Sequence, residues 1–218
     1  MSSTRGRSGI ILIAATILFI AAGQAGASVV LFSNLGPGDS YDIGMGGTLG
    51  GFAWPNSALA NGFTFWGPQS YLLDSIELAA GIVTGPNLLN VSIMTDVAGA
   101  PGVVLESFSF TNQMGQFGFA NPLLVGTSVA HPLLTPGTNY WLAASSPDPA
   151  WAAWNKASPM LIGPHAQSLG GGPWNVVPDS AEAFRINGMV AAVPVPGALL
   201  LGVVGLGCIG GLRRRRSA

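Results

Sequence analysis

Histidine and cysteine, the residue types that most often do chemistry in proteins, are nearly absent from this chain. Of 218 residues, two are His and one is Cys. His131 precedes Pro132 and His165 follows Gly163-Pro164, so we expect turn or loop side chains in contact with solvent. Neither stands at a metal-ligand spacing from another His or Cys, and one cysteine excludes a disulfide framework and a Cys-based zinc site. The sequence therefore predicts no cofactor.

Pairs of acidic residues offer another route to chemistry, because a glycosidase needs only two carboxyl groups about 5 to 10 Å apart. The candidate pairs are Asp74 with Glu77 and Asp179 with Glu182. Acids three residues apart in a β-rich chain more often mark turns, and the G-x-S-x-G elbow of serine hydrolases is missing from the sequence. We expect a protein without catalytic residues, and a secreted hydrolase is the alternative.

Two further groups of residues suggest ligand binding. Asp39 and Asp42 are weak candidates for calcium, a hard cation that prefers oxygen ligands, and the alternative is an ordinary Asx turn. Trp151 and Trp154 are candidate sugar contacts, because exposed aromatic rings stack on the apolar faces of sugars. The alternative, which we favour, is that these large side chains fill a hydrophobic core.

The charges of the chain are distributed unevenly. The formal net charge is −1, but six of the eight cationic residues are arginines near the two ends. Between the ends only Lys156 and Arg185 oppose all nine acidic residues. Nucleic-acid binding requires clustered Lys and Arg for phosphate contacts, so this acidic middle region excludes a nucleic-acid partner.

Residues 1–27 have the three-part layout of a secretory signal peptide. Arg5 and Arg7 form the basic start, an apolar run of about 13 residues follows, and Ala25 and Ala27 form an A-x-A site. The run is too short to span a bilayer as a helix. We expect export through the Sec translocon and cleavage by signal peptidase after Ala27.

The C-terminal segment, residues 191–218, begins with a proline motif: Val193, Pro194, Val195 and Pro196. An uncharged run from Gly197 to Leu212 follows, long enough for about 24 Å of helix, which can just span a membrane with help from flanking residues. The sequence then ends in a cluster of topology-setting arginines: Arg213, Arg214, Arg215 and Arg216. By the positive-inside rule these hold the extreme C-terminus in the cytoplasm, so the middle region faces outward.

This order of proline motif, glycine-rich apolar segment and terminal arginines resembles the PEP-CTERM sorting signal, in its VPLPA-like variant. Val195 stands where the name-giving glutamate would be. The resemblance implies an exosortase-type transpeptidase that cuts near the prolines. It also implies a stay in the inner membrane, followed by a place on the cell surface or in the extracellular matrix of a Gram-negative-type bacterium. The alternative is a plain C-terminal membrane anchor.

The middle region, residues 28–190, reads as one all-β domain. Short runs rich in Val, Ile, Thr and aromatic residues alternate with Gly-Pro turns, which is typical of antiparallel strands. Nine strands are predicted: Ser28–Asn34, Asn61–Trp66, Leu73–Ala80, Leu89–Asp96, Val103–Thr111, Thr127–Leu133, Tyr140–Ser145, Trp151–Lys156 and Ala183–Val190. The loop from Gly163 to Pro173 is expected to be flexible. So many strands in about 160 residues favour a jelly-roll-like β-sandwich over one open sheet.

Several stretches of the middle region, among them 91–106 and 134–142, are similar to the choice-of-anchor R domain of bacterial surface proteins. That resemblance implies an extracellular module without catalytic residues. Together these observations predict a non-enzymatic exported protein of the cell surface or exopolysaccharide matrix. A carbohydrate-binding module that uses exposed tryptophans is the alternative.

Overall fold

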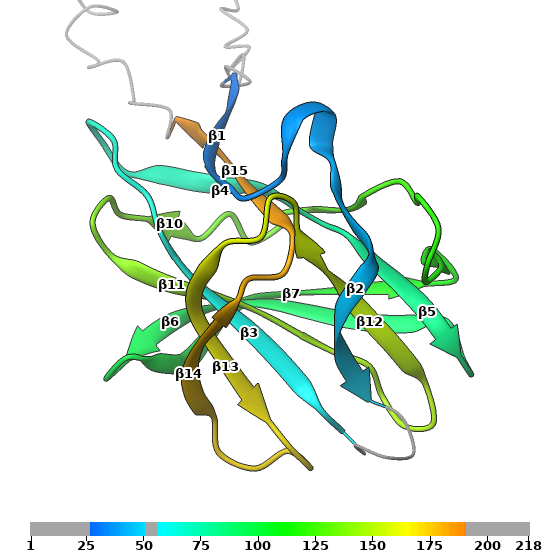
Figure 1. The fold of residues 1–218 in the computed structure, drawn as a ribbon. Coiled ribbons are helices and arrows are strands. Elements are labelled where there is room, and N and C mark those ends of the chain that lie inside the picture. The colour runs from blue at the N-terminus through cyan, green and yellow to red at the C-terminus, as the bar shows by residue number, and fades with distance from the viewer. Residues whose placement is uncertain (1–26, 51–55, 191–218) are drawn as a thin grey trace, which may run out of the picture.

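The computed structural model describes residues 27–50 and 56–190, which form an all-β domain (Figure 1). The fold class predicted from the sequence is confirmed at this level. Ala25 with the rest of the predicted signal peptide before Ala27, and the whole C-terminal sorting segment, lie outside the described residues. No helix within the described ranges is long and apolar enough to cross a bilayer.

The described chain contains fifteen strands and one short 3-10 turn, η1 (Pro37–Asp39). The first eight strands are β1 (Ser28–Ser33), β2 (Tyr41–Gly50), β3 (Ala58–Thr64), β4 (Tyr71–Leu78), β5 (Ala80–Thr84), β6 (Leu88–Val97), β7 (Ala100–Thr111) and β8 (Gly115–Gln116). The remaining strands are β9 (Leu124–Thr127), β10 (Leu133–Leu134), β11 (Asn139–Ser145), β12 (Trp151–Ala157), β13 (Ile162–Ser168), β14 (Asn175–Ser180) and β15 (Phe184–Val190).

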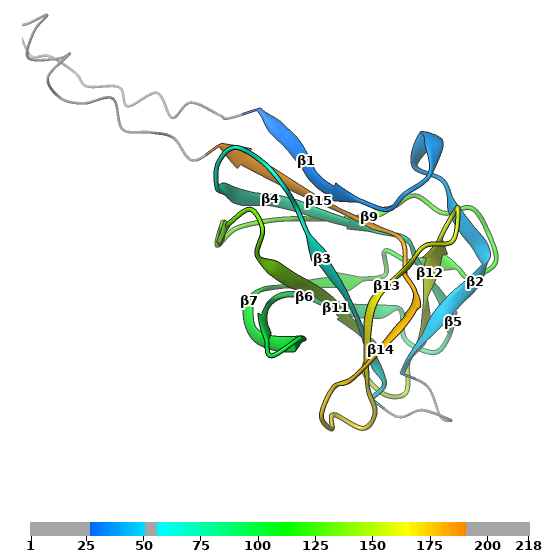
Figure 2. The same cartoon turned by 60° about the vertical axis from the view of Figure 1, so that its left-hand side comes forward.

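These strands form three sheets. The first has the order β1-β15-β4-β10, with β9 also paired to β4; the second has the order β14-β13-β3-β11-β6-β7; and the third has the order β2-β12-β5-β8. All pairs are antiparallel except the two-residue contact of β5 with β8. Figure 2 shows the β1–β15–β4 layer lying over the layer that holds β3, β11, β6 and β7. This face-to-face packing is consistent with a β-sandwich.

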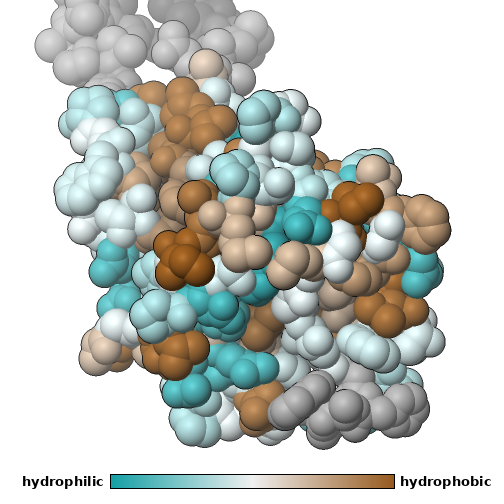
Figure 3. Space-filling view, in the orientation of Figure 1, coloured by the Kyte–Doolittle hydropathy of each residue, from teal (hydrophilic) through white to brown (hydrophobic). Residues whose placement is uncertain are grey.

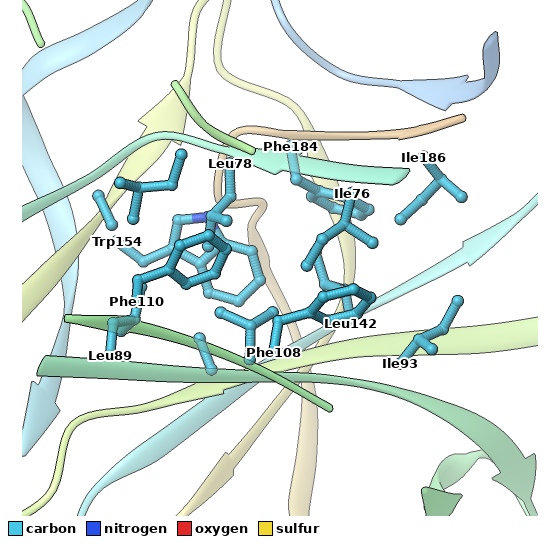
Figure 4. Packing of buried hydrophobic residues seen from close by; sticks show 14 of the residues in the cluster. Ile76, Leu78, Leu89, Ile93, Phe108, Phe110, Leu142, Trp154, Phe184 and Ile186 are labelled. Carbon is cyan, nitrogen blue, oxygen red and sulfur yellow. The ribbon is translucent and has the colours of Figure 1, made fainter. Parts of the chain in front are cut away.

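The space between the layers is filled by aliphatic and aromatic side chains from both sides. Ile76 and Leu78 from β4 and Phe184 and Ile186 from β15 point toward side chains of the second sheet, such as Leu142 (Figure 4). In a strand, side chains alternate between faces, so each of these strands presents every second residue to the core. Burial of this apolar area is the main favourable term that stabilises the fold.

The longer hydrophobic strands predicted from the sequence are confirmed, whereas several polar or glycine-rich strands were missed. β1, β4, β6, β7, β11, β12 and β15 match predicted strands within a few residues. The prediction of a flexible loop from Gly163 to Pro173 is wrong for its first half, because β13 pairs there with both β3 and β14. The predicted strand Thr127–Leu133 is also wrong: the chain forms β9 before it and β10 at its end.

Trp154 provides the sharpest test of this core. Its side chain is 0% exposed, its ring packs edge-on against Phe184, and its Nε1 donates to the carbonyl of Ala183 at 3.0 Å. We expect Trp154→Ala to lower the free energy of unfolding by about 3–5 kcal/mol, because it leaves a large cavity. The measurement is denaturant-induced unfolding.

Trp151→Ala is the matched control, because Trp151 lies on the same strand with 40% of its surface exposed. It should cost less than about 1 kcal/mol. Equal losses for the two variants would show that the core does not centre on Trp154.

Candidate functional site

The two aspartates considered for calcium bind the protein itself. Asp42 Oδ1 accepts hydrogen bonds from the backbone N–H groups of Gly44 and Met45 at 2.9 and 3.0 Å, which is the Asx turn given above as the alternative. Asp39 forms an ion pair with Arg185. Across residues 27–50 and 56–190, no group of three His, Cys, Asp or Glu side chains is placed to share a metal ion.

The two candidate sugar contacts differ in exposure. Trp154 lies in the core, which agrees with the favoured alternative, so it is not placed to contact a sugar at the surface. Trp151 is partly exposed at the start of β12 and stays available to a ligand. The difference follows from position along the strand, because Trp151 begins β12 and the rest of the strand, Ala152 to Ala157, is buried.

In the acidic pair Asp74 and Glu77, the carboxylate of Glu77 is held by two side chains of β15. Glu77 Oε2 accepts from Arg185 Nη1 at 3.0 Å, and Glu77 Oε1 accepts from Asn187 Nδ2 at 2.7 Å. Both contacts join β4 to β15 within the first sheet. Glu77 therefore serves the pairing of two strands.

The two histidines have different surroundings. His131 sits in a turn, as predicted, with its Nδ1 2.9 Å from the carbonyl oxygen of Leu73. His165 corrects the prediction of a solvated loop side chain, because it lies on β13 and is 6% exposed. β13 runs between β3 and β14, and this pairing on both edges turns its side chain toward the interior.

A buried polar cluster surrounds His165, and we take it as the candidate site. Lys156 Nζ, from β12, donates to Glu182 Oε1 at 2.6 Å and to the carbonyl of Ser180 at 2.5 Å. His165 Nε2 lies 3.6 Å from the same Glu182 oxygen. Asn61 Oδ1, from β3, accepts from the backbone N–H of Glu182 at 3.2 Å. Residues from β3, β12 and β13 thus converge on Glu182, with Lys156 and His165 at its carboxylate and Asn61 at its backbone.

This cluster lines a cavity of about 280 Å³. The wall is made of Gly47, Thr48, Leu59, Lys156, His165, Gln167, Asp179 and Glu182. Asp179 and Glu182, one of the acidic pairs noted in the sequence, therefore face the same space. A side chain at position 47 would collide with the wall, since a Cβ there would lie 2.5 Å from Glu182 Oε1. Glycine at this position therefore lets β2 pack directly against Glu182.

Both carboxyl groups at the cavity are held in the charged form. Burial alone would raise the pKa of Glu182, but His165 and the ammonium of Lys156 outweigh it and keep that pKa below its usual range. The pKa of Asp179 is lowered mainly by the backbone N–H of Ser180, which donates to Oδ1 at 2.6 Å, with smaller effects from Lys156 and His165. Glu182 is therefore suited to accept hydrogen bonds, and unsuited to donate a proton as a general acid.

Several atoms of the cluster make no hydrogen bond within the described part of the chain. They are Asn61 Nδ2, His165 Nδ1, His165 Nε2 and Glu182 Oε2. Buried polar groups in native proteins are nearly always paired with protein, water or ligand. The cluster thus retains the capacity to bind a polar molecule.

A second, more apolar cavity of about 500 Å³ lies where β13 diverges from β3. Phe32, Phe63, Phe184, Asp96 and Trp141 are among its lining residues. Trp141 Nε1 donates to Asp96 Oδ2 at 2.8 Å, so these two polar groups are already paired. This second cavity could contact a ligand through apolar side chains but has few unpaired polar groups to orient it.

Sequence reasoning missed the cluster because its members are far apart along the chain. Lys156 and Glu182 are 26 residues apart, and Asn61 is 121 residues from Glu182. Two signals were available: Asp179 and Glu182 form an acidic pair, and Lys156 is a lone cation at the end of a predicted hydrophobic strand, where a buried charge requires a partner.

The buried ion pair predicts that removing one charged partner destabilises the protein more than removing both. We expect Lys156→Met to lower the free energy of unfolding by about 3–5 kcal/mol, because it leaves the Glu182 carboxylate buried without its cation. Lys156→Met combined with Glu182→Leu should lose less than Lys156→Met alone, since no charge is then buried. Denaturant unfolding of both proteins measures this, and a double variant less stable than the single one would contradict a buried pair.

The lowered pKa values also predict acid sensitivity. The pKa of Glu106 is also lowered: burial would raise it, but the Ser128 hydroxyl and two backbone N–H groups that donate to its carboxylate outweigh burial. In the unfolded chain Glu106 and Glu182 take up protons near the ordinary pKa of 4.5, whereas in the folded chain they stay charged to lower pH. The free energy of unfolding should therefore fall as the pH drops below about 4.5, because the unfolded state then binds more protons. In thermal unfolding scans at a series of pH values, the stability of the double variant Glu106→Gln/Glu182→Gln should fall less steeply with decreasing pH than that of the wild type. An equally steep fall would contradict the lowered pKa values of these two residues.

Comparisons with known proteins assign no family to this chain. No family model matches it, and no curated protein matches it either. Among solved structures, it is similar to the cysteine protease and lectin-like domains of Cwp84, a surface layer associated protein of Clostridium difficile, with 12% identity and a TM-score of 0.43. The similarity covers 63% of this chain and 33% of that chain.

Proposed function

We propose that this chain is an exported, non-enzymatic protein that displays a jelly-roll-like β-sandwich at the cell surface or in an exopolysaccharide matrix. It leaves the cell through the Sec translocon and loses its signal peptide after Ala27. An exosortase-type enzyme in the inner membrane then cuts near Pro194 and Pro196.

The observation that carries this proposal is the pairing of the first strand with the last. Ser28 of β1 lies opposite Met189 of β15 in the antiparallel ladder, so the two ends of the described domain lie side by side (Figure 1). A domain with adjacent ends can be held at one point while the rest of its surface faces outward. In addition, β1 begins at Ser28, the first residue that signal-peptide cleavage would leave.

The surface near the paired ends suits a position close to a membrane. Val29, Val30 and Val190 are all exposed there, although valine is usually buried. Figure 3 shows hydrophobic residues near this end of the domain and a mixed surface elsewhere on the same face. Before the tail is cut, these side chains would lie next to the lipid headgroups.

Intact-mass spectrometry of the protein from membrane and extracellular fractions of its native host tests the proposal. We expect an extracellular species that starts at Ser28 and ends near Pro194–Pro196. The variant Pro194→Ala/Pro196→Ala should remain in the membrane with its arginines, because the cutting enzyme loses its motif.

Pro173→Ala, which changes a loop proline outside the motif, is the matched control and should be processed normally. Recovery of only a membrane species that retains Arg213 to Arg216 would overturn the sorting step. Recovery of a species with an intact N-terminus would overturn export by cleavage.

A further inference from the structure

We propose that the cavity over Lys156, His165 and Glu182 is a binding site for one neutral, hydroxyl-rich sugar unit. The proposal relies on the export proposed above only for the supply of the ligand. It goes beyond that role, since it names a site and a chemical class of ligand. The tryptophan-based carbohydrate contact considered from the sequence plays no part in it.

The first argument is the unmet hydrogen-bonding capacity of the cavity wall. Glu182 is 0% exposed and His165 is 6% exposed, yet Glu182 Oε2 and both His165 ring nitrogens have no partner within the described residues. Leaving a buried polar group unpaired costs about 1–3 kcal/mol. A ligand that pairs these atoms recovers that cost on binding.

The second argument concerns which chemical group fits. Glu182 Oε2 is a charged acceptor and requires a donor, whereas His165 presents two ring nitrogens, at least one of which is a donor. A hydroxyl group both donates and accepts through one oxygen atom, and adjacent hydroxyls can serve both residues together. Thr48 and Gln167 also line the cavity, and their hydroxyl and amide groups can both donate and accept hydrogen bonds.

The third argument is charge. Two carboxylates, Asp179 and Glu182, face the cavity against one ammonium group, Lys156, and that ammonium already donates to Glu182 and to a carbonyl. An anionic ligand would meet repulsion from both acids. The site therefore favours a neutral sugar over a uronic acid of similar shape.

The fourth argument is size. A cavity of about 280 Å³ falls at the lower limit of the range for drug-sized ligands, about 300–1,000 Å³. It suits one ring and is too small for an oligosaccharide. Leu59 gives the wall an apolar side chain for the C–H groups of such a ring.

Calorimetric titration of the exported protein with glucose, galactose, mannose, sorbitol and glucuronate tests the site. We expect saturable binding of at least one neutral hexose with a dissociation constant on the order of 1 mM. Glucuronate should bind at least tenfold more weakly. Sorbitol distinguishes a requirement for a ring from a requirement for hydroxyl groups alone, and sorbitol binding as tight as that of the best hexose would overturn the sugar assignment in favour of a polyol.

Two variants locate the binding. Glu182→Gln should weaken binding about tenfold, because a hydrogen bond to a charged acceptor is lost. Asp179→Asn, at the exposed side of the cavity, should weaken it by a smaller factor and keeps the test valid if Glu182→Gln fails to fold. Asp42→Asn is the matched control, because it makes the same carboxylate-to-amide change in an Asx turn that lies outside the cavity wall.

NMR of His165, a residue of the cavity wall, tests directly whether the sugar binds there. The imidazole nitrogen resonances of His165 should shift on addition of the best hexose to the wild-type protein. Absence of saturable binding by every sugar would show that the cavity holds only water. Equal affinity in wild type, Glu182→Gln and Asp179→Asn would place the binding elsewhere.

Discussion

The buried ion pair between Lys156 and Glu182 is the constraint on which the arrangement of the three sheets depends. Lys156 belongs to the third sheet, and Glu182 lies in the short link between β14 of the second sheet and β15 of the first. The same link exchanges backbone hydrogen bonds with β12 at Ala157 and Asn155, and Asn34 holds it from the side of β1. A charge pair in an apolar interior is tolerated only with good geometry and further hydrogen bonds, and this link supplies them.

Much of the fold follows from local sequence, because hydrophobic alternation in a strand is a local signal. β6 and β15 are rich in apolar residues at every second position, and both were predicted. β2 and β14 carry little such signal: β2 contains four glycines, and β14 contains a proline and three polar residues. They become strands because neighbouring strands offer hydrogen-bonding partners, which no local pattern reveals.

The candidate site was less accessible to sequence reasoning than the fold. Its acids were noted as a pair, and its histidine and lysine were seen individually, but nothing in their spacing joined them. Long-range pairing of β13 with β3 brings His165 next to Asn61. The isolated backbone bridge between Lys156 and Glu182 places those two residues side by side. For the tryptophans, the favoured expectation of a core position is met by Trp154, whereas Trp151 is 40% exposed.

The place of β15 within its sheet has a mechanical consequence. β15 is paired along its length with β1 on one side and β4 on the other, and both neighbours run antiparallel to it. A pull applied at Val190 acts along the strand axis, so the hydrogen bonds of two ladders carry the load together in shear. The strand cannot be peeled away one bond at a time. A domain held through this strand would resist the drag of moving fluid better than one held through an edge strand such as β14.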